Sequence, residues 1–89
     1  MSQKAKILVI DDEPSIREML QIFLKREGFG VTIAGSGEDG LRLIQKEDFD
    51  VVVSDIKMPD MTGIDLLSLV RSENVAVTFI LLTAFATTA

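Results

Sequence analysis

Residues 6–12 read Lys-Ile-Leu-Val-Ile-Asp-Asp, an apolar run that stops at two acidic residues. A second run, Val-Val-Val-Ser-Asp at residues 51–55, has the same form and stops at Asp55. Near-continuous apolar runs of this length are typical of strands buried on both faces of a parallel sheet. Because parallel strands point the same way, we expect Asp11, Asp12 and Asp55 to converge at the carboxyl edge, where open α/β sheets bind ligands.

The segments around these two runs alternate between helix and strand patterns. Apolar residues recur at helical spacing in residues 16–24, 41–44 and 64–70, and further apolar strand patterns occupy residues 31–34 and 77–82. Gly28 suits the end of the first helix, and Ser36 with Asp39 resembles a capping box at the start of the second. The order βαβαβαβ predicts an α/β fold with a parallel sheet and right-handed crossovers.

Composition bounds the possible chemistry. The chain has 89 residues and a net charge of −5, so we expect one small domain that does not bind nucleic acid. It contains no Cys and no His, which excludes thiolate chemistry and histidine general bases within this segment. We find no signal peptide or membrane span, and we therefore expect no contact with a membrane and a cytoplasmic location.

Three converging carboxylates repel one another, and at neutral pH they need a divalent cation or shared protons. We therefore predict a shared cation site at Asp11, Asp12 and Asp55, although each alone could be a solvated turn or capping residue. Thr83 ends the fourth predicted strand, so its hydroxyl could reach the same edge, or it could simply be a β-branched strand residue or a helix cap.

Residues 35–40 read Gly-Ser-Gly-Glu-Asp-Gly, which spells a dinucleotide-binding fingerprint. Two observations disfavour a nucleotide site. Glu38 and Asp39 place negative charge in the first helical turn, where a pyrophosphate would bind. The motif also lies in the second βα unit instead of the first. A tight turn before a capped helix is the preferred interpretation, and a nucleotide-binding fragment remains a lesser alternative.

Three segments together resemble the receiver domain of two-component response regulators, the CheY-like family: residues 7–12, 55–63 and 81–84. The loop after Asp55 is most similar to receivers of sigma-54-dependent, NtrC-like activators. The resemblance implies that Asp55 accepts a phosphoryl group from a sensor histidine kinase. It implies a Mg²⁺ ion held by Asp11, Asp12, Asp55 and the backbone carbonyl of Lys57. It also implies a switch hydroxyl at Thr83, with Ala84 beside it.

The resemblance further implies a flavodoxin-like sheet of order 2-1-3-4-5 and an output domain, DNA-binding or AAA+, outside this segment. Residues 1–89 end before the fifth strand and last helices of such domains, so we expect a truncated receiver. Exposed sheet edge and core surface should then favour a homo-oligomer or a domain-swapped dimer.

We expect no enzymatic activity beyond self-catalysed phosphoryl transfer and dephosphorylation. The main alternative is a phosphorylation-incompetent interaction or oligomerisation module. An aspartate-based phosphohydrolase would need a second Asp at the position of Lys57, which disfavours that reading.

Overall fold

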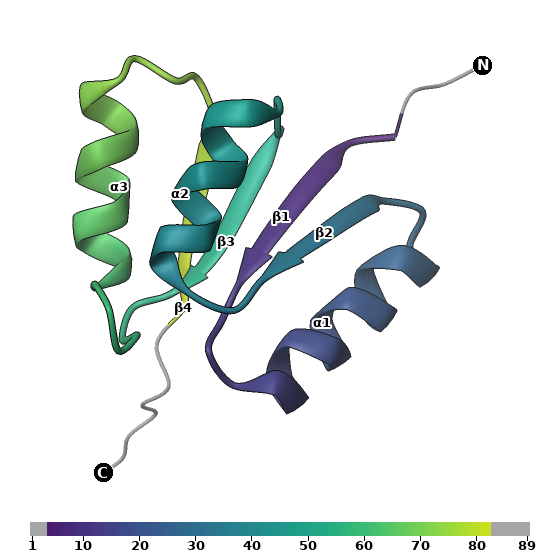
Figure 1. Ribbon diagram of the computed structural model, residues 1–89. Helices are drawn as coiled ribbons and strands as arrows, with labels where there is room; N and C mark the ends of the chain where they lie inside the picture. Colours follow the sequence, from purple (N-terminus) through teal and green to yellow (C-terminus); the bar gives the residue numbers. More distant parts are fainter. Residues whose placement is uncertain (1–3, 83–89) are drawn as a thin grey trace, which may run out of the picture.

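The computed structural model describes residues 4–82, and within them strands and helices alternate strictly along the chain. The elements are β1 (Lys6–Ile10), α1 (Pro14–Arg26), β2 (Gly30–Ala34), α2 (Gly37–Lys46), β3 (Val51–Asp55), α3 (Gly63–Ser72) and β4 (Thr78–Leu82). The strands form a parallel sheet of order β2-β1-β3-β4 (Figure 1). The predicted α/β fold is therefore confirmed, and the order agrees with the first four places of the expected 2-1-3-4-5 sheet.

The main core lies between the sheet and the pair of helices α2 and α3, which run side by side (Figure 1). Leu8 of β1, Val52 of β3 and Leu66 of α3 are completely buried in this core. Burying an aliphatic side chain of this size stabilises a fold by about 1.5–3 kcal/mol. Because side chains alternate across a strand, Val9 points to the opposite face, where α1 covers β1 and β2.

Helix α1 buries its side chains less completely than the other two helices do. None of its residues is buried, and Met19, Ile22 and Phe23 are each more than half exposed. The predicted apolar stripe of α1 is therefore only partly a core face, since Leu20 and Leu24 are half-buried whereas Ile16, Met19 and Phe23 are exposed. Helical periodicity identified an apolar side, but the area available to cover it depends on neighbouring elements.

The helix ends follow local sequence. Gly28 follows α1 with a φ of +98°, a left-handed conformation that glycine adopts without strain. Ser36 caps α2 by accepting a hydrogen bond from the Asp39 N–H at 3.1 Å. A reciprocal capping box, which was not predicted, joins Thr62 and Asp65 at the start of α3. Within residues 4–82, no helix has the length and apolar character needed to cross a membrane.

Candidate functional site at the carboxyl edge

The structure brings Asp11, Asp12 and Asp55 together at the carboxyl edge of the sheet. Ile10 of β1 pairs with Ser54 of β3, so the acidic residues that follow them lie on adjacent strand ends. One carboxylate oxygen from each of the three residues lies within 4.8 Å of the others. Parallel pairing of β1 and β3 therefore creates the cluster from residues more than forty positions apart.

The three carboxylates have different surroundings. Asp11 is buried, Asp55 is half-buried and Asp12 is exposed. The Glu13 N–H donates to Asp11 Oδ1 at 2.9 Å. Burial raises the pKa of Asp11, the hydrogen bond from Glu13 opposes this rise, and the negative charges of Asp55, Asp12 and Glu13 add to it. Ionisation of Asp11 is therefore costly without a compensating positive charge.

Arg17 of α1 reaches back to the segment that carries the two leading acids. Its Nη1 donates to the Asp11 backbone carbonyl at 2.7 Å. A Cβ added at Gly35 would lie 3.1 Å from the same nitrogen, so glycine leaves room for the guanidinium. This bond ties α1 to the segment that follows strand β1. Sequence reasoning did not identify this contact, because Arg17 carries no motif that distinguishes it from other helical arginines.

The β3–α3 loop, residues 56–62, follows Asp55 and turns back sharply. The Gly63 N–H donates to the Ile56 carbonyl at 2.7 Å, and a Cβ at Gly63 would lie 2.5 Å from the Asp55 carbonyl oxygen. Only glycine permits the loop to return this close to Asp55. Lys57 is exposed and Met58 is buried, so the loop that carries the predicted ligand carbonyl of Lys57 is packed into the core by the next residue. Its role in metal binding stays a prediction.

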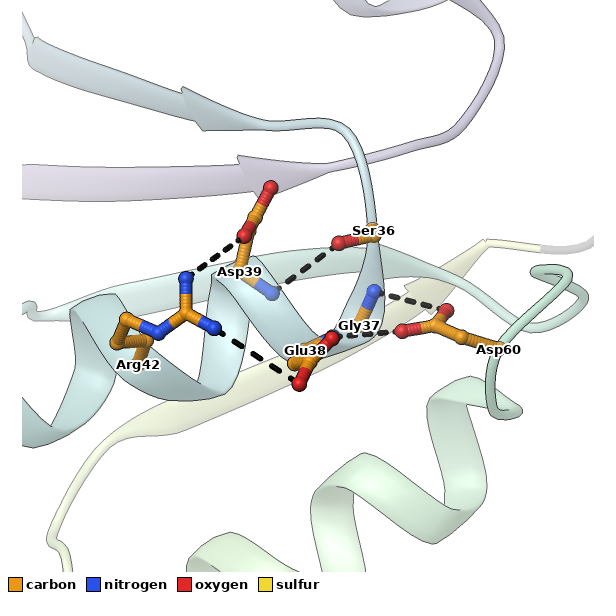
Figure 2. A network of polar contacts seen from close by, with 6 residues as sticks. All are labelled: Ser36, Gly37, Glu38, Asp39, Arg42 and Asp60. Carbon is orange, nitrogen blue, oxygen red and sulfur yellow. Dashed lines mark hydrogen bonds and ion pairs between the residues drawn. The ribbon is translucent and has the colours of Figure 1, made fainter.

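A second polar network joins this loop to α2 (Figure 2). Asp60 accepts hydrogen bonds from the Gly37 N–H at 3.1 Å and the Glu38 N–H at 2.8 Å. In a dinucleotide site, these amide groups would face a pyrophosphate. Here the Asp60 carboxylate uses them, which further disfavours the nucleotide-binding alternative. Sequence reasoning missed Asp60, because its partners lie 22 and 23 residues away.

The acidic first turn of α2 also has its own counter-charge. The Arg42 guanidinium lies 3.1 Å from Asp39 Oδ1 and 3.8 Å from Glu38 Oε2 (Figure 2). All three side chains are exposed, so these pairs stabilise the helix only slightly.

Thr83 and Ala84 lie outside the described residues, and their predicted roles remain predictions. Strand β4 ends at Leu82, which pairs with Asp55 in the parallel register.

The donor set of the cluster fits a hard divalent cation. Carboxylate oxygens are the usual protein ligands of Mg²⁺ and Ca²⁺, and Mg²⁺ commonly takes one or two carboxylates together with water and phosphate oxygens. A cation here would offset both the repulsion among Asp11, Asp12 and Asp55 and the cost of burying the charge of Asp11. The half-buried Asp55 keeps access to solvent, which a group that reacts with an external molecule requires.

Comparison with proteins of known sequence supports one family. Probable transcriptional regulatory protein TcrX of Mycobacterium tuberculosis is 43% identical over 82 residues, which are 92% of this chain and 35% of TcrX. Transcriptional regulatory protein GlrR of Escherichia coli is 38% identical over 85 residues, 94% of this chain and 19% of GlrR. The chain thus spans about a third or less of the length of these relatives.

Solved structures agree with this assignment. Response regulator protein TrrA from Thermotoga maritima, in complex with Mg²⁺-BeF, matches with a TM-score of 0.87 and 38% identity, over 92% of this chain and 71% of TrrA. Chemotaxis response regulator CheY4 of Vibrio cholerae matches with a TM-score of 0.88 and 37% identity, over 96% of this chain and 72% of CheY4. The family model of the response regulator receiver domain matches residues 7–89. The chain therefore belongs to the receiver domains of two-component response regulators.

Proposed function

We propose that Asp55 accepts a phosphoryl group from the phosphohistidine of a sensor histidine kinase. The observation that carries the proposal is the carboxylate cluster, in which the half-buried Asp55 lies beside Asp11 and Asp12 at the carboxyl edge. The proposal extends to regulation of transcription through an output domain, DNA-binding or AAA+, outside this segment. The similarity to TcrX and GlrR, which are both named transcriptional regulatory proteins, supports that part. A cytoplasmic location, with the kinase domain as partner, belongs to the same proposal.

The chemistry follows from the positions of the carboxylates. An oxygen of Asp55 attacks phosphorus, and an O–P bond forms while the N–P bond breaks and its electron pair stays on the imidazole nitrogen. Asp11, Asp12, Asp55 and the Lys57 carbonyl would hold Mg²⁺, which supplies positive charge to the phosphoryl oxygens. Asp11 is a poor nucleophile because it is buried and accepts a backbone hydrogen bond. The Thr83 hydroxyl and the Ala84 N–H are proposed to contact the phosphoryl oxygens.

The test is covalent labelling by a small phosphodonor. The chain is incubated with Mg²⁺ and acetyl phosphate, and its intact mass is measured. We expect the mass of one added phosphoryl group, no addition when a chelator removes Mg²⁺, and none in Asp55→Asn, whose amide cannot form an acyl phosphate. Unchanged labelling of Asp55→Asn would assign the reaction to another residue.

The alternative, an interaction module that never accepts phosphoryl, predicts a different outcome. Such a module would remain unlabelled and would show no change of its amide signals near Asp55 with Mg²⁺ and beryllofluoride. A receiver that binds the phosphoryl analogue should instead shift the signals around the acidic cluster and the β3–α3 loop.

We also propose that residues 1–89 form a receiver unit that associates with a second copy, either face to face or by exchange of elements. Exposed apolar side chains support this, namely Ile16, Met19, Ile22 and Phe23 of α1 and Ile80 of the edge strand β4. Sedimentation velocity should show a dimer or larger species that dissociates on dilution. The variant Phe23→Glu should shift this equilibrium toward the monomer. A well-folded wild-type monomer at high concentration would refute this association.

A further inference from the structure

We propose that Asp60 is a positioning residue, a role that rests on the proposed function of the neighbouring site. Its carboxylate ties the β3–α3 loop to the first turn of α2 (Figure 2). Through this tie, Asp60 holds the loop that carries Lys57, whose backbone carbonyl is a proposed Mg²⁺ ligand. Asp60 is not one of the proposed Mg²⁺ ligands, and its proposed role is to position one of them.

The geometry of the tie fixes orientation as well as distance. Asp60 Oδ1 accepts from the Gly37 N–H at 3.1 Å, and Oδ2 accepts from the Glu38 N–H at 2.8 Å. Two separate oxygens thus bind two successive amides, which restrains rotation of the carboxylate plane. The first N–H groups of a helix have no partner inside the helix, so α2 has them available for Asp60.

Packing beside the hydrogen bonds supports the same tie. A Cβ at Gly37 would collide with Cγ of Met61, so the absence of a side chain there lets the loop lie directly against α2. Met61 also packs against the hydrophobic core. The loop is therefore held at three places: at its base by the Gly63 to Ile56 hydrogen bond, along its apolar side by Met58 and Met61, and at its tip by Asp60.

This restraint matters for metal binding because Mg²⁺ demands near-ideal octahedral geometry. Lys57 lies three residues before Asp60 in a short loop, so a movement of the tip is transmitted to the Lys57 carbonyl. Groups that orient metal ligands without touching the metal commonly change metal affinity by an order of magnitude or more when removed. Asp60 is exposed and acts through a backbone ligand, so we expect a smaller effect, of about tenfold at most.

Ser36 provides a matched control. Its hydroxyl caps the same helix by accepting from the Asp39 N–H, yet this bond lies within the start of α2 and has no partner in the β3–α3 loop. Asp60→Ala and Ser36→Ala should therefore lower the urea midpoint of unfolding by similar amounts. Only Asp60→Ala should loosen the loop.

The experiment measures Mg²⁺ affinity of the wild type, Asp60→Ala, Asp60→Asn and Ser36→Ala by following backbone amide signals during titration with Mg²⁺ alone. We expect the dissociation constant to rise about three- to tenfold in Asp60→Ala and to change less than about twofold in Ser36→Ala. Asp60→Asn keeps one acceptor oxygen and should give an intermediate value. Amide hydrogen exchange in residues 56–62 should be faster in Asp60→Ala than in Ser36→Ala.

Two outcomes would overturn the role of Asp60. One is wild-type Mg²⁺ affinity in a folded Asp60→Ala protein, and the other is an equal loss of affinity in Ser36→Ala. If the wild type itself fails to bind Mg²⁺, the metal site of the proposed function is refuted, and the role of Asp60 toward it falls as well. Loop exchange rates that do not differ between the two variants would refute the tie on their own, independently of any metal.

Discussion

Asp11 and Asp60 are both aspartates in loops at the carboxyl side of the sheet, yet their burial and hydrogen bonding are opposite. Asp11 is only 3% exposed, receives one backbone N–H and faces two other carboxylates. Asp60 is exposed and binds the first two amides of α2. The Asp11 carboxylate therefore lies among other negative charges, whereas the Asp60 carboxylate accepts hydrogen bonds from the start of a helix.

The pKa values reflect this contrast. Burial raises the pKa of Asp11, and the charges of Asp55 and Asp12 raise it further against one opposing hydrogen bond. At Asp60, desolvation that would raise the pKa is outweighed by the backbone N–H groups of Glu38 and Gly37, which lower it. Ionisation of Asp11 therefore costs folding free energy, whereas ionisation of Asp60 contributes to it. The cost at Asp11 is what a bound cation would offset.

The largest loss of folding stability should come from a substitution at Gly63, where the β3–α3 loop returns to Asp55. Gly63 closes the loop between Asp55 and α3, and a Cβ there would meet the Asp55 carbonyl oxygen at 2.5 Å and Leu81 Cδ2 at 2.9 Å. Gly63→Ala should lower the free energy of unfolding by about 3 kcal/mol, because backbone cannot move aside cheaply in a packed core. Urea unfolding followed by circular dichroism measures this change.

Gly30→Ala is the control for that substitution. The nearest atom to a Cβ at Gly30 is 3.8 Å away, an ordinary van der Waals contact, so its unfolding free energy should stay within about 1 kcal/mol of the wild type. Equal effects of the two substitutions would mean that the close approach at Gly63 does not exist in solution.

At the acidic cluster we expect a smaller change in folding stability, and in this case a gain. Asp11→Asn removes a buried negative charge but keeps an oxygen that can accept the Glu13 N–H. Without Mg²⁺, this variant should be more stable than the wild type, since burial and the neighbouring charges raise the pKa of Asp11 and make its ionisation costly. With millimolar Mg²⁺ the wild type should gain stability and the variant much less. Thermal unfolding with and without Mg²⁺ tests this, and a metal-free variant less stable than the wild type would contradict the comparison.

The smallest effect on folding stability should come from Asp60, whose exposed carboxylate binds the first two N–H groups of α2. Asp60→Asn should cost about 0.5 kcal/mol at neutral pH, because an exposed helix cap contributes little. The pKa of Asp60 is lowered in the folded state, so this contribution is present above the ordinary aspartate pKa and is lost as pH falls through the lower, folded value.

Asp11 should behave in the reverse way as the solution is acidified. The pKa of Asp11 is raised in the folded state, so ionised Asp11 lowers the free energy of unfolding at neutral pH. This destabilisation disappears as pH falls from the raised pKa toward the ordinary pKa of aspartate. Urea titrations at several pH values without metal should therefore show both variant differences shrinking in acid, from opposite signs. Differences of the same sign at neutral pH would show that Asp11 and Asp60 are not opposed.

The secondary structure and the acidic cluster could largely be predicted, because the sequence patterns that indicate them are local. Apolar runs and helical spacing identified the alternation of strands and helices, and Gly28 and Ser36 were recognised from nearby residues. Parallel strands necessarily end at one edge, which was enough to predict that Asp11, Asp12 and Asp55 converge. The exposure of α1 was only partly predictable, since periodicity shows that a helix has an apolar side and leaves open how much of it is covered.

The sequence by itself therefore determined the order of elements, the parallel sheet and the acids at its strand ends, because each depends on neighbours or on strand direction. The tertiary structure alone decided that Asp60 binds α2, that Arg17 holds the Asp11 carbonyl and that Gly63 lies against Asp55. These contacts depend on how loops from different βα units approach one another in space. No local spacing rule encodes that approach, because it results from packing of the helices against the completed sheet.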